Sequence, residues 1–138
     1  MSRVVTAPKL RAGAKTKTRR DQNSETTRHE IMRAARRLFA RQGYAATSLG
    51  AIVRAAKVTT GAIYHHFGDK KALFQAVAEA VEVEILERIL TAGGERSAPW
   101  DRLVTGTSAM LGICAEPHIQ RIVFVDAPNV IGAQEWRE

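Results

Sequence analysis

The feature that most limits the possible fold is a pair of short helical segments within residues 26–75, with a longer helical segment before them and another after them. Apolar residues recur in each segment at the spacing of one face of an α-helix. Breaks at Lys57-Val58 and at Gly68-Asp69 separate successive segments. Two short helices joined by a tight turn and flanked by stabilising helices make a helix-turn-helix. Short helices are marginal alone, so we expect the flanking helices to supply the core that holds them.

Residues with end-capping preferences predict the helix boundaries. We expect the first helix from Thr27 to Gln42, because Thr27 and Glu30 form a capping-box pattern and Gly43 is typical of a helix C-terminus. The caps expected for the second, third and fourth helices are Thr47, Thr59 and Asp69. The third helix is expected from Thr60 to about His66, and the fourth from Lys70 to Leu90.

The remaining chain also has helical rather than strand patterns. Helices are expected after Pro99, from Pro117 and after the Asp126-Ala127-Pro128 turn. No segment alternates between apolar and polar residues with hairpin signals on either side. The sequence therefore predicts an all-α fold with short connections.

Charge and composition narrow the range of possible functions. Residues 1–75 hold sixteen of the 21 Lys and Arg residues but only four of the 14 Asp and Glu residues, so this half is the one suited to a polyanion. The single cysteine, Cys114, can form no internal disulfide, which fits the cytoplasm. No apolar run approaches the ~20 residues of a membrane span. Residues 1–25 are basic and lack periodicity, and we expect a disordered arm that either adds contacts to DNA or only increases solubility.

The third helix has a surface suited to the major groove of DNA, which admits one α-helix. Gly61 and Ala62 permit close approach to base edges, while Thr60 and Tyr64 carry hydroxyl groups that donate hydrogen bonds. Helix N-termini with free amides favour phosphate, which makes further candidates of Thr47 and Thr59. A cation at the start of the fourth helix opposes the helix dipole, and a phosphate would explain Lys70 there.

Several alternatives remain open from the pattern alone. An ordinary helical bundle would show much the same periodicity, and a sequence-independent binder of nucleic acid or membrane surfaces would need only the basic arm. An enzyme is disfavoured because no nucleophile motif, phosphate-binding glycine loop or metal-ligand spacing is present. His65 and His66 are adjacent on a helix and so point about 100° apart, which does not suit one metal ion. We expect no cofactor and no metal.

One stretch resembles the DNA-binding signature of the TetR family of bacterial repressors. It runs from Gly43-Tyr44-Ala45-Ala46-Thr47-Ser48-Leu49 through Gly61-Ala62-Ile63-Tyr64-His65-His66-Phe67 to Leu73. The resemblance implies phosphate contacts from Thr47, Tyr64, His65 and Lys70, and a groove-facing surface of Thr59, Thr60, Gly61 and Ala62; Ser48 and Lys57 complete the candidate DNA-binding set. It implies core positions for Phe39, Tyr44, Ile52, Ile63, Phe67 and Leu73.

The chain departs from the family pattern in the turn of the motif. The family usually has glycine where this chain has Lys57. Glycine is favoured in a turn that needs positive φ. Lys57 would then be strained, or the turn differs slightly; the ammonium could also add a phosphate contact.

The C-terminal part resembles, less specifically, a stretch of the regulatory domain of some TetR-like proteins. The segment that carries this resemblance runs from Arg121 to Glu138. The chain looks like a fragment, because such domains continue for several more helices.

We therefore divide the chain into a basic arm (1–25), a DNA-binding domain (26–72) and a partial ligand-binding and dimerisation domain (73–138). The implied function is a homodimeric repressor released from a palindromic operator by a small-molecule effector. The candidate residues for the effector pocket, each also compatible with ordinary core, are Trp100, Met110, Leu111, Cys114 and Phe124.

Overall fold

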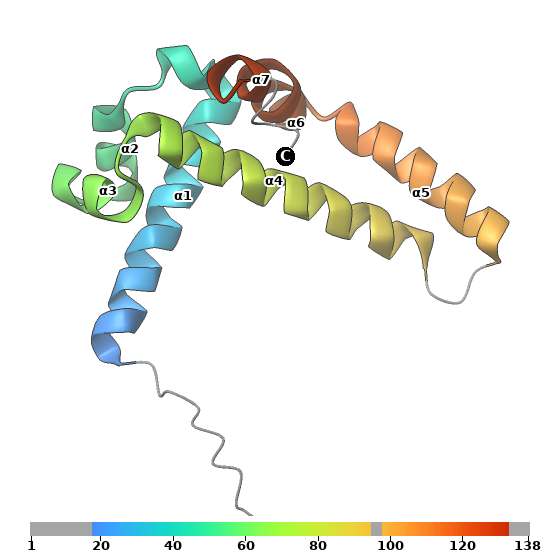
Figure 1. Cartoon of the computed structure of the whole chain (residues 1–138), viewed down its shortest axis with the longest axis horizontal. Coiled ribbons are helices and arrows are strands. Elements are labelled where there is room, and N and C mark those ends of the chain that lie inside the picture. Colours follow the sequence, from blue (N-terminus) through green and yellow to red (C-terminus); the bar gives the residue numbers. More distant parts are fainter. Residues whose placement is uncertain (1–17, 95–97, 133–138) are drawn as a thin grey trace, which may run out of the picture.

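The computed structural model describes residues 18–94 and 98–132, and these residues form helices with no strand among them (Figure 1). The predicted all-α fold is confirmed. The longest helices are α1 (Arg19–Ala46), α4 (Lys70–Gly93) and α5 (Pro99–Cys114). The short helices α2 (Leu49–Ala56) and α3 (Thr60–Phe67) lie between α1 and α4 along the chain, as the helix-turn-helix prediction requires.

Helix α1 begins eight residues earlier than the predicted Thr27. Thr18 is its N-cap and forms a capping box with Asp21. Thr27 lies inside the helix, where its hydroxyl donates to the carbonyl oxygen of Asn23 at 3.0 Å. The prediction missed the first two turns because they are polar and exposed, whereas the apolar stripe begins only at Ile31. Residues 19–25 of the predicted arm are thus helical, and residues 1–17 lie outside the described residues.

A kink interrupts α1 near its C-terminus. Gly43 has φ 81° and ψ 170°, and one further helical turn extends to Ala46. This φ lies in a region that glycine enters without steric cost. The predicted end at Gly43 therefore marks the place where the regular helix stops, although the helical segment continues beyond it.

Side-chain caps fix the starts of the three helices that follow. Ser48 accepts a hydrogen bond from the amide of Ala51 at 3.1 Å. The predicted cap of α2 was Thr47, so this prediction is one residue early. Helices α3 and α4 have the predicted caps: the oxygens of Thr59 and Asp69 accept from main-chain amides at 3.2 and 2.7 Å.

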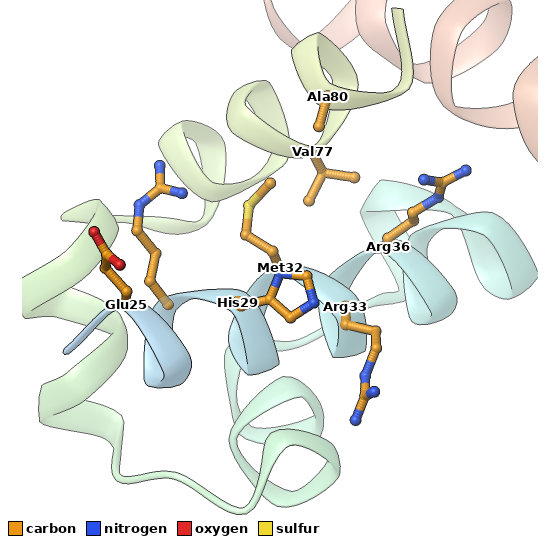
Figure 2. A pocket seen from close by; sticks show the side chains of 8 residues that line it. Glu25, His29, Met32, Arg33, Arg36, Val77 and Ala80 are labelled. Atoms are coloured by element: carbon orange, nitrogen blue, oxygen red, sulfur yellow. The ribbon is translucent and has the colours of Figure 1, made fainter. Parts of the chain in front are cut away.

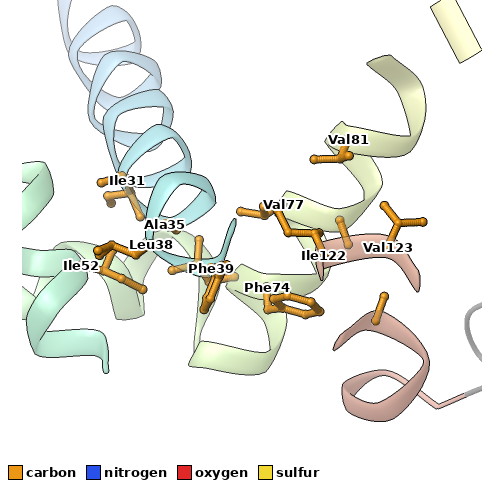
Figure 3. Close-up of a cluster of buried hydrophobic side chains, with 14 of the residues drawn as sticks. Ile31, Ala35, Leu38, Phe39, Ile52, Phe74, Val77, Val81, Ile122 and Val123 are labelled. Carbon is orange, nitrogen blue, oxygen red and sulfur yellow. The ribbon is translucent and has the colours of Figure 1, made fainter. Parts of the chain in front are cut away.

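One apolar core joins the N-terminal and C-terminal parts of the chain (Figure 3). Phe39, Ile52, Ile63 and Leu73 are completely buried, as predicted, and Phe67 and Tyr44 pack against them half-buried. The same cluster contains Ile122 and other residues from the helices that follow α5: Ile119, Val123, Ala127 and Ile131. The predicted boundary at residue 73 therefore falls within a continuous core, because α4 belongs to both sides.

The C-terminal helices pack against two places, the distal half of α4 and the kinked end of α1. Helix α5 runs back along the distal half of α4 (Figure 1). The short helices α6 (Pro117–Ile119) and α7 (Ala127–Val130), with the π-helix η1 (Gln120–Asp126) between them, return to the kinked end of α1. No helix in the described part of the chain is long and apolar enough to cross a membrane.

Candidate DNA-binding interface

Helix α3 presents a small and polar face to solvent. Ile63 is completely buried, whereas Thr60, Gly61, Tyr64 and His65 are exposed. The Tyr64 side chain is 54% exposed although it is large and aromatic. Helical spacing therefore separates the core-facing side of α3 from an outward face whose side chains are small near the N-terminus and larger one turn later. Such a face matches a helix that approaches a groove by its N-terminal end.

Both helices of the motif begin with an exposed N-terminus. Ser48 and Thr59 are exposed and cap α2 and α3. Each cap satisfies one main-chain amide of the first turn, which leaves other amides directed outward. Positive partial charge at these N-termini favours an anion such as a DNA phosphate.

Thr47 does not have the accessibility that the sequence predicted. Its relative exposure is 1%. The hydroxyl donates to the carbonyl oxygen of Gly43 at 2.7 Å and accepts from Nε2 of Gln42 at 3.2 Å. Both interactions lie within the end of α1, so the Thr47 side chain is structural. The adjacent Ser48, one residue later, occupies the exposed position.

Lys57 adopts the left-handed conformation, with φ 56° and ψ 40°. The amide of Lys57 donates to the carbonyl of Arg54, and that of Val58 donates to Val53. This pair of bonds is a Schellman motif, which commonly has glycine at the left-handed position. The strained turn expected from the family pattern is thus present, and the exposed Lys57 side chain lies between α2 and α3.

Lys70 has a partner other than DNA. Its ammonium lies 4.2 Å from the centroid of the Tyr44 ring, a cation–π contact. Burial lowers the pKa of Lys70, and burial followed by the charge of Asp69 raises the pKa of the Tyr44 hydroxyl. Tyr44 itself packs edge-on against Phe74 at 5.0 Å between ring centroids, which supports its predicted structural role. A phosphate is therefore not the sole explanation for a cation at the start of α4.

The end of α3 contacts α1 just before the apolar stripe that begins at Ile31. The Arg28 guanidinium lies 4.8 Å from the centroid of the Phe67 ring. The pKa of His66 is lowered by burial, then by the neighbouring His65, then by Arg28. These contacts place a basic stretch of α1 beside the helix-turn-helix. Arg28 lies within the helix predicted from Thr27 to Gln42, but it was not among the predicted site residues.

The five predicted effector residues are not gathered around one cavity in the described structure. Trp100 is 72% exposed, and the other four are exposed or half-buried on α5 and η1. Of the five, Met110 lines a shallow groove between α4 and α5. A separate groove of about 570 Å³ lies between α1 and α4, where Met32 on α1 points toward Val77 and Ala80 on α4 (Figure 2). None of the five predicted residues lines that groove.

Metal-binding chemistry has no support in residues 18–94 and 98–132. No cluster of three or more His, Cys, Asp or Glu side chains there could hold a metal ion. His65 and His66 lie 5.1 Å apart between ring centroids and meet edge to face. Their arrangement is that of two packed rings.

Sequence comparison identifies two regions of the chain. Residues 31–77 match the family described as bacterial regulatory proteins, tetR family. Residues 100–138 match a tetracyclin repressor-like C-terminal domain. The chain belongs to the TetR family. This family consists of DNA-binding transcriptional regulators, which are mostly repressors.

Individual TetR-family relatives agree with this assignment. The HTH-type transcriptional regulator AcrR of Shigella flexneri is 50% identical over 66 residues, which are 48% of this chain and 31% of that protein. The regulator HbdR of Aromatoleum sp. (strain CIB) is 40% identical over 90 residues, covering 62% of this chain and 34% of the relative. The chain thus spans about a third of the length of these curated relatives.

A solved TetR-family structure extends the similarity beyond the helix-turn-helix. A transcriptional regulator from Pectobacterium atrosepticum superposes with a TM-score of 0.73 at 40% identity, over 83% of this chain and 58% of that one. A TetR-family regulator from Marinobacter aquaeolei shares the fold with a TM-score of 0.64 at 20% identity. The first turns of α1, including Arg28, precede the region matched by the family's N-terminal model.

Proposed function

We propose that this chain binds double-stranded DNA at specific sequences by inserting α3 into the major groove. The observation that carries the proposal is the outward face of α3, where small and hydrogen-bonding side chains are exposed beside two exposed helix N-termini. The major groove distinguishes all four base pairs by their donor and acceptor patterns. A face with hydroxyl groups and no bulky side chain near its start suits direct contact with base edges.

The candidate contacts divide into base-reading and phosphate-binding groups. Thr60, Gly61 and Ala62 lie where α3 would approach base edges, with Thr59 at the same end. Tyr64 and His65 lie one turn later, where phosphate contacts are more common. Ser48, Lys57 and Lys70 are the other phosphate candidates, each at the end of a helix.

Family membership also supports a proposal about how DNA binding is regulated. We propose a cytoplasmic homodimer whose two α3 helices bind half-sites one DNA turn apart, as in other dimeric helix-turn-helix proteins. A small molecule that binds one conformation better than the other would change the DNA affinity. The predicted residues on α5 and η1 remain the candidates for its pocket.

A selection from random double-stranded DNA tests the proposal. The expected result is an inverted repeat whose half-site centres are about 10 base pairs apart. The chain should bind that site roughly 10³-fold or more tightly than a scrambled duplex at physiological salt. Failure to enrich any site, with binding that disappears as salt is raised, would instead support the alternative function, a sequence-independent binder that acts through its basic arm.

A further inference from the structure

The kink at Gly43 exposes main-chain groups that a regular helix would satisfy internally. In an unbroken α-helix the amide of Tyr44 would donate to the carbonyl four residues earlier. Here that amide donates to Oδ2 of Asp126 at 2.8 Å. On the other side of the kink, the carbonyl oxygen of Gln42 accepts from Nη2 of Arg121 at 3.4 Å. Two side chains of the C-terminal segment therefore bind the main chain on both sides of Gly43.

The π-helix η1 brings these two side chains together. Nε of Arg121 lies 3.5 Å from Oδ2 of Asp126, five residues further along the chain. In an α-helix, residues five apart point about 140° away from each other. The wider turn of a π-helix places them closer to one side, and π-turns occur frequently at functional sites. The Asp126 side chain is only 15% exposed, so its carboxylate is held between its partners with little access to water.

Glycine at position 43 is required twice by this arrangement. A Cβ atom there would lie 2.2 Å from Nη2 of Arg121, far inside contact distance, and the φ of +81° disfavours any other residue. The kink and the approach of the guanidinium therefore depend on the same residue. We call the set Gly43, Arg121 and Asp126 the kink clamp.

The kink clamp lies directly before the DNA-binding motif. The carbonyl oxygen of Gly43 accepts from the buried Thr47 hydroxyl, and the next residue, Ser48, caps α2. The Tyr44 ring lies beneath the Lys70 ammonium at the start of α4. The clamp thus contacts the connection into α2 and, through Tyr44, the connection out of α3.

We propose that Arg121 and Asp126 are positioning residues that fix the kink of α1, and that they thereby set the orientation of α2 and α3 for DNA. The segment from α6 to α7 acts on DNA binding through this contact, without touching DNA. This inference rests on the proposed DNA-binding function. Loosening the clamp lowers the fraction of molecules with a binding-competent motif, and the apparent affinity falls by that fraction.

The first test measures the clamp without DNA. In Asp126→Ala the Tyr44 amide loses a charged acceptor, and its hydrogen exchange should accelerate by about tenfold or more. The buried Leu73 amide on α4 should keep its wild-type rate, which shows that the core is folded. Asp101→Ala is the matched control, because the same substitution removes one carboxylate from the exposed start of α5. A wild-type exchange rate for Tyr44 in the Asp126 variant would overturn the proposal.

The second test measures binding to the selected duplex by fluorescence anisotropy. Removing a carboxylate makes the chain more positive, which alone would strengthen DNA binding, as we expect for Asp101→Asn. Asp126→Asn should nevertheless bind about tenfold more weakly than that control. Arg121→Gln should bind more weakly than Arg102→Gln, which removes the same charge from α5.

The two readouts separate this inference from the proposed function. If wild-type protein shows no sequence preference, the proposed function fails, and the exchange of the Tyr44 amide still tests the contact. If wild-type protein binds its site and the Asp126 and Arg121 variants match their controls, the positioning role is wrong while the proposed function stands. Should Asp126→Ala unfold, the near-isosteric Asp126→Asn provides both measurements.

Discussion

Between α2 and α3, the residue in the left-handed conformation is a lysine, although a residue with a Cβ atom is disfavoured in that conformation. Lys57 has φ 56° and completes a Schellman motif that ends α2. A non-glycine residue in this conformation costs about 1–2 kcal/mol. A lysine retained at such a position would be explained by a contact made by its exposed ammonium, such as the phosphate contact proposed above.

Lys57→Gly is therefore expected to stabilise the fold and weaken DNA binding at the same time. The free energy of unfolding should rise by about 0.5–1 kcal/mol, because relief of strain exceeds the added entropy of the unfolded chain. Affinity should fall on every duplex to a similar extent, as expected for a lost phosphate contact. Chemical denaturation and anisotropy measure the two effects. Arg54→Gly, within α2, should instead destabilise by about 1 kcal/mol. An unfolding free energy for Lys57→Gly below the wild-type value would contradict the assignment of strain.

The cap of α2 was hard to predict from the sequence because two adjacent residues have similar chemistry. Thr47 and Ser48 both have hydroxyl groups that can cap a helix. The turn after the Gly43 kink buries the first and exposes the second. Sequence spacing could not choose between them, because the choice depends on that turn. Positive φ at Lys57 was predictable, since the family pattern has glycine there.

At the scale of elements, an ion pair links α1 to the middle of α4. Nη1 of Arg36 lies 2.6 Å from Oε2 of Glu84, and the two side chains are 33% and 36% exposed. The pKa of Glu84 is lowered, first by the hydrogen bond from Arg36 and further by the charges of Arg36, Arg88 and His118, against an opposing effect of burial. Because both side chains are partly exposed to solvent, this ion pair should contribute only modestly to the free energy of unfolding.

Glu84→Gln is expected to lower the free energy of unfolding by about 0.5 kcal/mol near neutral pH. The folded-state pKa of Glu84 lies below its unfolded value, so the stabilisation is present above the unfolded pKa. It is lost as pH falls through the folded pKa. The difference from wild type should therefore shrink below about pH 4.5. Thermal unfolding from pH 3 to 8 measures it, with the exposed Glu87→Gln as control. A difference that grows in acid would have the wrong sign.

The outward face of α3 permits a test of contact type. Thr60→Ala should change the preferred base at one position of the selected site and cost about 1–3 kcal/mol of discrimination. Tyr64→Phe should instead weaken binding to all duplexes similarly, because it removes a hydroxyl proposed to bind phosphate. Repeating the selection with each variant distinguishes the two. An unchanged base preference in Thr60→Ala would remove that residue from the base-reading group.

Helices with an apolar stripe were predictable as elements, and those without one were not. The apolar stripe from Ile31 onward predicted α1, but the polar first turns of this helix were not predicted. Apolar residues at helical spacing, Ile119, Ile122 and Val123, predicted a helix from Pro117, and the structure has α6 and η1 there. The π form of η1 was not predictable, because it accompanies the contacts of Arg121 and Asp126 with the α1 kink. Those contacts join residues about 80 positions apart, which local patterns cannot report.

At the scale of the whole molecule, a basic N-terminal half is joined by one core to an acidic C-terminal half. The chain carries a formal net charge of +7, and the C-terminal half, which holds ten of the 14 acidic residues, opposes it. The all-α class and the family were predictable from about 45 residues of pattern. The continuity of the core across α4 was not, because it arises when the segment after α5 returns to α1.

The measurement that tests the central claim most directly is the ratio of specific to non-specific DNA affinity after removal of residues 1–17, which carry five basic residues and no acidic ones. If α3 reads the sequence, affinity for both duplexes should fall and the salt dependence should become shallower by about one unit per lost phosphate contact. The preference for the selected site over a scrambled one should stay near roughly 10³-fold or above. A preference that disappears with residues 1–17 would show that the basic arm, and not α3, determines where this protein binds.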